Sequence, residues 1–279
     1  LHSFPTRRSS DLKDTADITF GCEQGVNFIA ASFVRRAQDV LDVKKLLIEN
    51  GHPEIQIIAK IENSEGVENM DEILKVADGI MVARGDLGVE VPAEDVPLIQ
   101  KEVITKCKDM GKLVITATQM LESMQQNPRP TRAEVSDVAN AIFDGTDAIM
   151  LSGESASGLY PQEAVMTMSK IALKTENSLD YDALHRQAVR TAPQDTSEAI
   201  CMSVAEIASK FQVAAIIAFT ESGFTARKMS RYRPEARIIA ATPEVATTRA
   251  LAINWGVKPV KCKTMKNSVT KIGRASCRE

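Results

Sequence analysis

The amino-acid sequence predicts an α/β fold in which helices cover a parallel sheet. Apolar, β-branched runs of strand length alternate five times with amphipathic segments of helical length. Such alternation is typical of parallel sheets with helical crossovers. The strand-like runs are almost entirely apolar, as expected of strands that are covered on both faces. The chain has 279 residues, of which 44% are hydrophobic and 25% charged, an ordinary composition for a globular protein.

The elements of the first part of the chain follow from these runs. Strands are expected at 27–33, 55–60, 80–84, 113–117 and 148–151, and helices at 37–49, 67–77, 96–110, 132–143 and 161–175. The segment 96–110 shows the helical pattern clearly, because its apolar residues recur at spacings of three and four. Pro97 suits the first turn of this helix, and Gly111 suits its C-terminal cap.

A second, shorter α/β block is expected after a connection. The segment 177–196 is polar and contains Pro193, which indicates an exposed linker. Beyond it we expect helices at 197–210, 225–231 and 245–255 and strands at 214–219 and 237–241. The predicted organisation is therefore a first domain over 13–176, the linker 177–196 and a second domain over 197–272.

The two ends of the chain differ from the middle. Residues 1–12 show neither a helical nor a strand period, and residues 273–279 are similar. Both resemble translated sequencing-adapter read-through, which would make them non-native tails. The alternative is a pair of disordered native tails.

Charge, aromatic content and cysteine number exclude several classes of protein. The net charge is −3 and aromatic residues are 4%, so a general nucleic-acid binder is not expected. A local basic cluster is interpreted as a solvated face; it comprises Lys258, Lys261, Lys263 and Lys266. The five scattered cysteines form no C-x-x-C pair, which indicates reduced thiols in a cytoplasmic protein. No apolar run approaches the ~18 residues of a membrane span.

Polar residues gather where the predicted strands end. The groups are Ser32 and Arg35; Lys60 and Glu62; Arg84, Gly85 and Asp86; Thr116 and Thr118; and Ser152, Gly153 and Glu154. In a parallel barrel these positions share the C-terminal rim, where barrel active sites lie.

Lys60 and Glu62 are expected to point to the same side of their strand, because they are two residues apart. They could form a plain ion pair. Alternatively, Glu62 and Asp86 are two oxygen ligands of one divalent cation such as Mg²⁺, and Lys60 is a fixed positive charge beside a phosphoryl group.

Five stretches of this sequence closely resemble the active-site motifs of the pyruvate kinase family. They are IIAKIEN at 57–63, MVARGDLGVE at 81–90, TATQM at 116–120, NPRPTRAEVSDVANAIFD at 127–144 and MLSGE at 150–154. The resemblance runs from about residue 14 to residue 271. It implies phosphoryl transfer from phosphoenolpyruvate to ADP, giving pyruvate and ATP in glycolysis.

The resemblance also implies roles for single residues. Lys60 resembles the lysine that stabilises the transferring phosphoryl group, and Glu62 and Asp86 resemble the Mg²⁺ ligands. Gly85 and Asp86 resemble the backbone site for the substrate carboxylate, and Thr118 resembles the threonine near the carbon that is protonated. Ser152 and Glu154 are expected to support that proton delivery.

The second domain resembles the family's C-terminal domain. Its loop 220–225 looks like the one that binds a sugar-phosphate effector in many members; the residues concerned are Thr220, Ser222, Gly223 and Thr225. The alternative is an ordinary turn with an N-cap.

By this resemblance the five strands are the fourth to eighth of a TIM (β/α)8 barrel, so the chain is a partial barrel followed by a partial α/β domain. The K⁺ site and much of the nucleotide site would then lie outside this chain, and the intact protein would be a cytoplasmic homotetramer. Two other functions stay open: a magnesium-dependent barrel lyase acting on pyruvate-like substrates, and a non-catalytic sugar-phosphate-binding protein.

Overall fold

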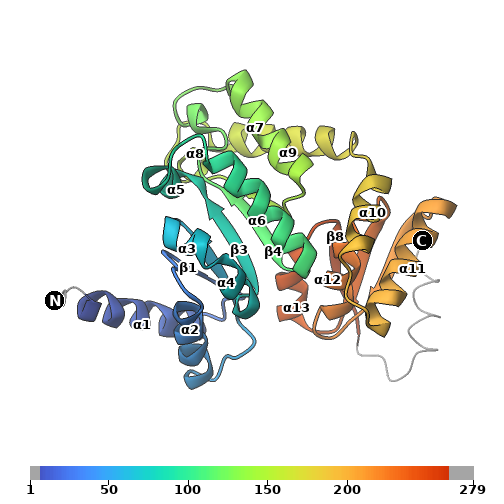
Figure 1. The fold of residues 1–279 in the computed structure, drawn as a ribbon, viewed down its shortest axis with the longest axis horizontal. Helices are drawn as coiled ribbons and strands as arrows, with labels where there is room; N and C mark the ends of the chain where they lie inside the picture. Colours follow the sequence, from blue (N-terminus) through green and yellow to red (C-terminus); the bar gives the residue numbers. More distant parts are fainter. Residues whose placement is uncertain (1–6, 264–279) are drawn as a thin grey trace. The chain divides into compact units, whose positions relative to one another are not determined.

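The computed structural model describes residues 7–263, and the side chains of residues 13–263. It contains two sheets, one of five strands in the order β1-β2-β3-β4-β5 and one of three strands in the order β6-β7-β8 (Figure 1). The chain divides into two compact units: one runs to Val103 and includes Ile115–Thr118, and the other comprises Ile104–Val114 and the chain from Gln119 onward. The predicted α/β class is confirmed. Within the described residues, no helix combines the length and the hydrophobicity that crossing a bilayer requires.

The strands of the first sheet lie within two residues of their predicted positions. They are β1 (Phe28–Ala31), β2 (Gln56–Ile61), β3 (Gly79–Ala83), β4 (Leu113–Ala117) and β5 (Ala148–Met150). β1 pairs in parallel with β2, and β2 pairs in parallel with β3, with Ile61 opposite Val82. Every residue of β3 is buried, as the apolar composition of the strands predicts.

The helices of this part alternate with the strands. They are α1 (Arg7–Glu23), α2 (Ala37–Glu49), α3 (Ser64–Glu68), α4 (Met70–Val76), α5 (Arg84–Glu90), α6 (Val96–Met110), the 3₁₀ turn η1 (Glu122–Gln125), α7 (Arg132–Asp144), α8 (Gly153–Ala156) and α9 (Pro161–Glu176). The single helix expected at 67–77 is wrong, because α3 ends at Glu68 and α4 begins at Met70, with Asn69 as the cap between them. Asparagine favours helix ends over helix interiors, since its side chain competes for backbone hydrogen bonds.

α1 begins within the segment 1–12, where no regular structure was expected. Its first described residue is Arg7, and it continues to Glu23. Extending a helix is far easier than nucleating one, so a helix formed by the later residues can continue into a segment that lacks an apolar period.

The predicted linker also contains a helix. α10 (Tyr181–Arg190) occupies half of the segment 177–196, which was expected to be an exposed connection. The Asp180 side chain caps it by accepting from the Ala183 N–H at 2.8 Å, and Arg190 lies in its last turn, where a positive charge is favourable. No α10 residue is fully buried, but Ala188 and Val189 are partly buried and pack against the core of the following block, so the segment is neither irregular nor wholly exposed.

The second sheet and its helices form the later α/β block. The elements are α11 (Thr196–Phe211), β6 (Ala215–Phe219), α12 (Phe224–Arg231), β7 (Arg237–Thr242), α13 (Val245–Ala250), the 3₁₀ turn η2 (Leu251–Ile253) and β8 (Val257–Lys261). β6 and β8 both pair in parallel with β7. β8 was not predicted; its lysines at 258 and 261 are exposed, in agreement with the solvated face that was expected there. Both charges are borne by a strand, and Lys266 lies outside the described residues.

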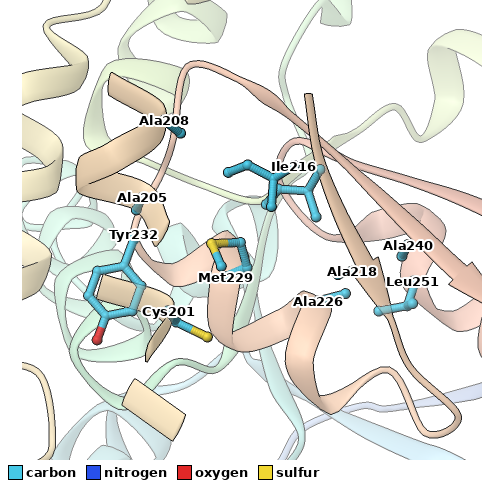
Figure 2. Close-up of a cluster of buried hydrophobic side chains, with 11 residues drawn as sticks. Cys201, Ala205, Ala208, Ile216, Ala218, Ala226, Met229, Tyr232, Ala240 and Leu251 are labelled. Atoms are coloured by element: carbon cyan, nitrogen blue, oxygen red, sulfur yellow. The ribbon is translucent and has the colours of Figure 1, made fainter. Parts of the chain in front are cut away.

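The core of this block consists mainly of small and aliphatic side chains and contains one aromatic ring, that of Tyr232 (Figure 2). Tyr232 is completely buried, and its hydroxyl donates to Glu198 Oε2 at 2.6 Å. Burial and the neighbouring Glu198 carboxylate both raise the pKa of Tyr232. Lys228 Nζ lies 3.1 Å from Glu198 Oε1, so the buried carboxylate has both a donor and a counter-charge.

Two arginines, one at the end of α12 and one just after it, bind segments that are distant along the chain. Arg231 Nη2 donates to the carbonyls of Asp109 at 2.6 Å and Thr191 at 2.7 Å. Arg233 forms an ion pair of 2.8 Å with Asp147, and both side chains are almost fully buried. These contacts join the end of α12 to the last turn of α6, to the end of α10 and to the turn that leads into β5.

Trp255 covers the second of these arginines. The Arg233 guanidinium lies over its ring, 4.9 Å from the centroid, and the Trp255 carbonyl accepts from Ser230 Oγ at 2.7 Å. The indole is buried in a cluster that includes Met120 and Val138. The stack and the hydrogen bond fix the start of β8 against α12.

Candidate active site

The end of β2 holds the predicted lysine–glutamate pair. Lys60 Nζ lies 2.6 Å from Glu62 Oε1, as expected for two residues that point to the same side of a strand. The Glu62 side chain is 1% exposed and that of Lys60 is 23% exposed. The carboxylate is therefore buried, and the ammonium group stays within reach of solvent.

The loop after β1 closes over this pair. Glu62 Oε2 accepts from the Phe33 N–H at 2.5 Å, and Lys60 Nζ donates to Ser32 Oγ at 3.0 Å. Phe33 has a φ of 52° and an exposed ring, an uncommon conformation for a residue other than glycine. From the sequence, Ser32 was noted only as a polar residue at a strand end, and Phe33 was not identified as part of the site. The one sequence signal for this loop was the polar Ser32 directly after an apolar strand.

Gly85 and Asp86 come just after β3, the strand that pairs with β2. Ile61 is opposite Val82 in the parallel register. Glu62, the residue after Ile61, therefore lies near the end of β3, where the sequence Arg84-Gly85-Asp86 begins. Gly85 and Asp86 lie in the first turn of α5, and Asp86 is exposed. A carboxylate in the first turn of a helix is electrostatically favourable.

Thr118 reaches the same turn from the end of β4. Its Oγ1 accepts from the Gly85 N–H at 2.7 Å and donates to its own strand, to the Ala117 carbonyl, at 2.6 Å. The structure thus places the threonine hydroxyl on the backbone amide that the sequence predicted for a substrate carboxylate.

Thr118 adopts a strained backbone conformation. Its φ is 66°, and that of the following Gln119 is 53°. For a β-branched residue this is an outlier, and conformations of this kind cost about 1–3 kcal/mol each. Strain of this kind concentrates at functional sites, where the surrounding structure holds it.

Glu62 and Asp86 fit the oxygen chemistry of a Mg²⁺ site. An ionised carboxylate offers about four lone-pair positions, so Glu62 retains acceptor capacity beside its contacts with Lys60 and Phe33. In the described part of the chain, no group of three or more His, Cys, Asp or Glu side chains could hold a metal. A cation held by this carboxylate pair would therefore complete its shell with substrate oxygens and water, as Mg²⁺ usually does.

Ser152 and Glu154 lie in the second compact unit, at the end of β5. Glu154 is fully buried in α8 and accepts two backbone hydrogen bonds, from Leu121 N at 3.0 Å and from Ser152 N at 2.8 Å. Ser152 is the residue before α8 and is half-buried. The carboxylate of Glu154 therefore holds the turn that carries Ser152.

The loop 220–225 borders a pocket of about 330 Å³. Thr220, Ser222 and Thr225 are among its lining residues, and Lys263 lies on its wall. Gly223 has a φ of 84°, and its N–H donates to Thr220 Oγ1 at 2.9 Å. The loop is thus a turn closed by Thr220, while no side chain caps the N-terminus of α12. The sequence had assigned Lys263 to a solvated face.

Comparisons with known proteins match both parts of the chain. The family described as pyruvate kinase, barrel domain, matches residues 9–165, and the one described as pyruvate kinase, alpha/beta domain, matches residues 198–278.

Several curated relatives are similar over most of the chain. The pyruvate kinase of Geobacillus stearothermophilus is 61% identical over 88% of this chain and 42% of the relative. The pyruvate kinases of Clostridium acetobutylicum and Clostridium perfringens are 55% and 57% identical over 89% and 90% of this chain, and over 52% and 53% of their own lengths. The chain thus spans about half the length of the curated relatives it matches.

Proposed function

Because this chain belongs to the pyruvate kinase family, we propose that the whole protein transfers a phosphoryl group from phosphoenolpyruvate to ADP. The observation that carries this proposal is the grouping of Lys60 beside the buried Glu62 with Thr118 beside Gly85, at the ends of β2, β3 and β4. The sheet is proposed to be the last five strands of an eight-stranded barrel, whose C-terminal rim is the usual place of an active site.

The proposed reaction has two stages. The bond between phosphorus and the enol oxygen breaks while a bond forms from phosphorus to a terminal oxygen of ADP. The remaining enolate takes up a proton at its methylene carbon and becomes pyruvate. Phosphoenolpyruvate, ADP and one proton are thereby converted to pyruvate and ATP.

The roles of the residues follow from charge and position. Lys60 stabilises charge on the transferring phosphoryl group. The Gly85 and Asp86 N–H groups bind the substrate carboxylate, which takes the place on Gly85 that Thr118 Oγ1 occupies here. Thr118 then lies beside the substrate carbon that is protonated.

Glu62 and Asp86 would hold Mg²⁺ between them. When bound, the cation would neutralise charge on the phosphoryl and enolate oxygens. The buried position of Glu62, tied by Lys60 and Phe33, orients one ligand in advance of substrate binding.

Glu154 is proposed to act on proton delivery through Ser152. Both of its oxygens accept backbone N–H groups, so it orients the turn at 152 rather than facing solvent. The Ser152 hydroxyl is then the group of this pair that supports the proton path.

Family membership also supports the remaining expectations. We propose a K⁺ requirement met by residues outside this chain, a homotetramer and a cytoplasmic place in glycolysis. The pocket beside 220–225 is the proposed site of a sugar-phosphate effector, because Thr220, Ser222 and Thr225, which carry hydroxyl groups, and the basic Lys263 line it.

The deciding experiment uses the full-length gene product that contains this chain. Pyruvate formation from phosphoenolpyruvate is measured with Mg²⁺ and K⁺, with and without ADP. ADP-dependent formation of pyruvate and ATP in equal amounts is expected. Pyruvate formed without ADP would indicate the lyase instead, and sugar-phosphate binding without turnover would indicate the non-catalytic binding protein.

A further inference from the structure

The side chain of Arg84 is buried beneath the end of β4. The residue begins α5 directly after β3 and is 8% exposed. Its Nε donates to the carbonyl oxygens of Ala117 at 3.3 Å and Thr118 at 3.2 Å, and its Nη2 donates to the Thr118 carbonyl at 2.7 Å. The guanidinium group therefore donates hydrogen bonds to both peptide carbonyls that flank the Thr118 α-carbon.

The same guanidinium is held from behind by α6. Arg84 Nη1 donates to Gln100 Oε1 at 3.3 Å, and Gln100 is 5% exposed. A buried positive charge is costly unless hydrogen bonds satisfy its donors, and the bonds to Ala117, Thr118 and Gln100 meet this need for Arg84. The guanidinium group is thus held on two sides, by Gln100 and by the end of β4.

The carbonyls of Ala117 and Thr118, which accept these bonds, belong to the strained part of the backbone. Thr118 has a φ of 66°, a conformation that persists in a β-branched residue only where neighbouring groups impose it. The carbonyl that follows this torsion accepts two of the Arg84 bonds. The conformation in turn directs Oγ1 of Thr118 to the Gly85 N–H, 2.7 Å away.

We propose that Arg84 is a positioning residue for Thr118. Its guanidinium holds the left-handed turn that keeps the threonine hydroxyl beside the Gly85 amide, where the substrate carboxylate is proposed to bind, and so beside the carbon that is protonated. The inference rests on the proposed function, and it adds a buried side chain to a motif whose backbone and Asp86 alone were expected to act.

Lysine is the discriminating replacement. It retains the charge but offers a compact ammonium group, which cannot reproduce the planar fork that reaches two carbonyls and Gln100 together. Arg186→Lys is the matched control, because Arg186 is exposed on α10 and has no part in the proposed site.

The first test is kinetic and uses the full-length protein. The unaltered protein is assayed for ADP-dependent pyruvate formation; its failure there would refute the proposed function and not the role of Arg84. In the active protein, Arg84→Lys is expected to lower kcat by about 10- to 100-fold, since misplacing a catalytic group by about 1 Å can cost about 100-fold. The KM for ADP and the result for Arg186→Lys should stay unchanged.

A second measurement isolates the proton step. Incorporation of solvent deuterium into the methyl group of pyruvate, followed by NMR with Mg²⁺ and ATP present, should fall in Arg84→Lys by a factor similar to that of kcat. Amide hydrogen exchange at Gly85 should become at least about tenfold faster in the folded variant, because its acceptor is no longer held. Unchanged kcat, deuterium incorporation and Gly85 exchange in folded Arg84→Lys would overturn the proposal.

A milder variant covers the case in which Arg84→Lys does not fold. Gln100→Met removes the Oε1 acceptor behind the guanidinium and keeps the bulk of the side chain. It should lower deuterium incorporation and kcat about 2- to 10-fold, on the scale of one lost hydrogen bond. If folded Gln100→Met matches the unaltered protein in both, the proposal fails.

Discussion

Lys60 is both a counter-charge for Glu62 and the group proposed to face the phosphoryl oxygens. Lys60→Met in the full-length protein removes the positive charge and keeps the apolar stem. We expect kcat to fall by at least about 100-fold, the scale of one lost electrostatic donor in an active site. Mg²⁺ affinity should change only modestly, because both carboxylates remain.

Steady-state kinetics and a Mg²⁺ titration of the variant check this expectation. Lys60→Arg is the control for charge alone. Near-normal turnover in Lys60→Met would remove Lys60 from the proposed role.

Glu134 links the pH dependence of stability to the cap of α7. Burial acts to raise its pKa, but hydrogen bonds from Ser123 and Thr131 outweigh burial and lower the pKa below its ordinary value of 4.5. The folded state therefore gains stability from ionised Glu134 above about pH 4.5, and this gain is lost as the pH falls through the depressed folded pKa.

Thermal unfolding between neutral and acid pH tests this linkage. Glu134→Gln should lower Tm at neutral pH, and its difference from the unaltered protein should shrink below pH 4.5. The exposed Glu163→Gln on α9 serves as control. A difference that stays constant across the pH range would contradict the prediction.

Local rules predicted some site residues better than others. The alternation of a strand sufficed to predict that Lys60 and Glu62 share a side, and the structure confirms it. The partners of Arg84 lie 33 and 34 residues away along the chain. No local sequence pattern predicts such a contact, because it depends on the relative positions of the ends of β3 and β4 in the folded sheet. The left-handed conformation of Thr118 was missed for the same reason.

Elements with strong periodicity were predicted almost to the residue, and short or polar ones were not. α2, α6 and β4 have the bounds that their apolar spacing predicted. α5 and α8 are one or two turns long, too short for a period to register. α10 has no fully buried residue, but Leu184, Ala188 and Val189 recur at helical spacing and are partly buried; this short stripe was missed beside the polar residues of the segment.

Two helical glycines differ in what surrounds them, and this difference makes a prediction. A methyl group on Gly66 in α3 would lie 2.6 Å from the Val34 carbonyl oxygen, whereas one on Gly88 in α5 would meet nothing closer than 3.8 Å. Gly66→Ala should destabilise the protein by about 1–3 kcal/mol through overpacking. Gly88→Ala should be neutral or stabilise by up to about 1 kcal/mol.

Urea unfolding of the full-length protein measures both changes. The paired variants control for helix propensity, since each replaces a helical glycine by alanine. Equal effects at the two positions would show that the carbonyl of Val34 does not limit α3.

At the level of the whole chain, the five-stranded sheet ends at β1 and β5, and five strands of this kind do not close a barrel. If the sheet is part of the proposed barrel, we expect the 279-residue polypeptide, expressed alone, to lack ADP-dependent pyruvate formation and to bind a hydrophobic dye strongly, because surfaces that further strands would cover stay exposed. A coupled assay and dye fluorescence test this, with the full-length protein as control. Turnover by the isolated polypeptide would contradict the expectation.

The stacking of Arg233 on Trp255 gives the chain an optical reporter. Trp255 is the sole tryptophan in the 279-residue sequence, so indole emission from this polypeptide arises from one place. That place lies over the guanidinium that pairs with Asp147, beside the carbonyl bound by Ser230. Loosening of α12 from the turn before β5 would admit water to the indole and shift its emission to longer wavelength, so the integrity of this junction can be followed without attaching a label.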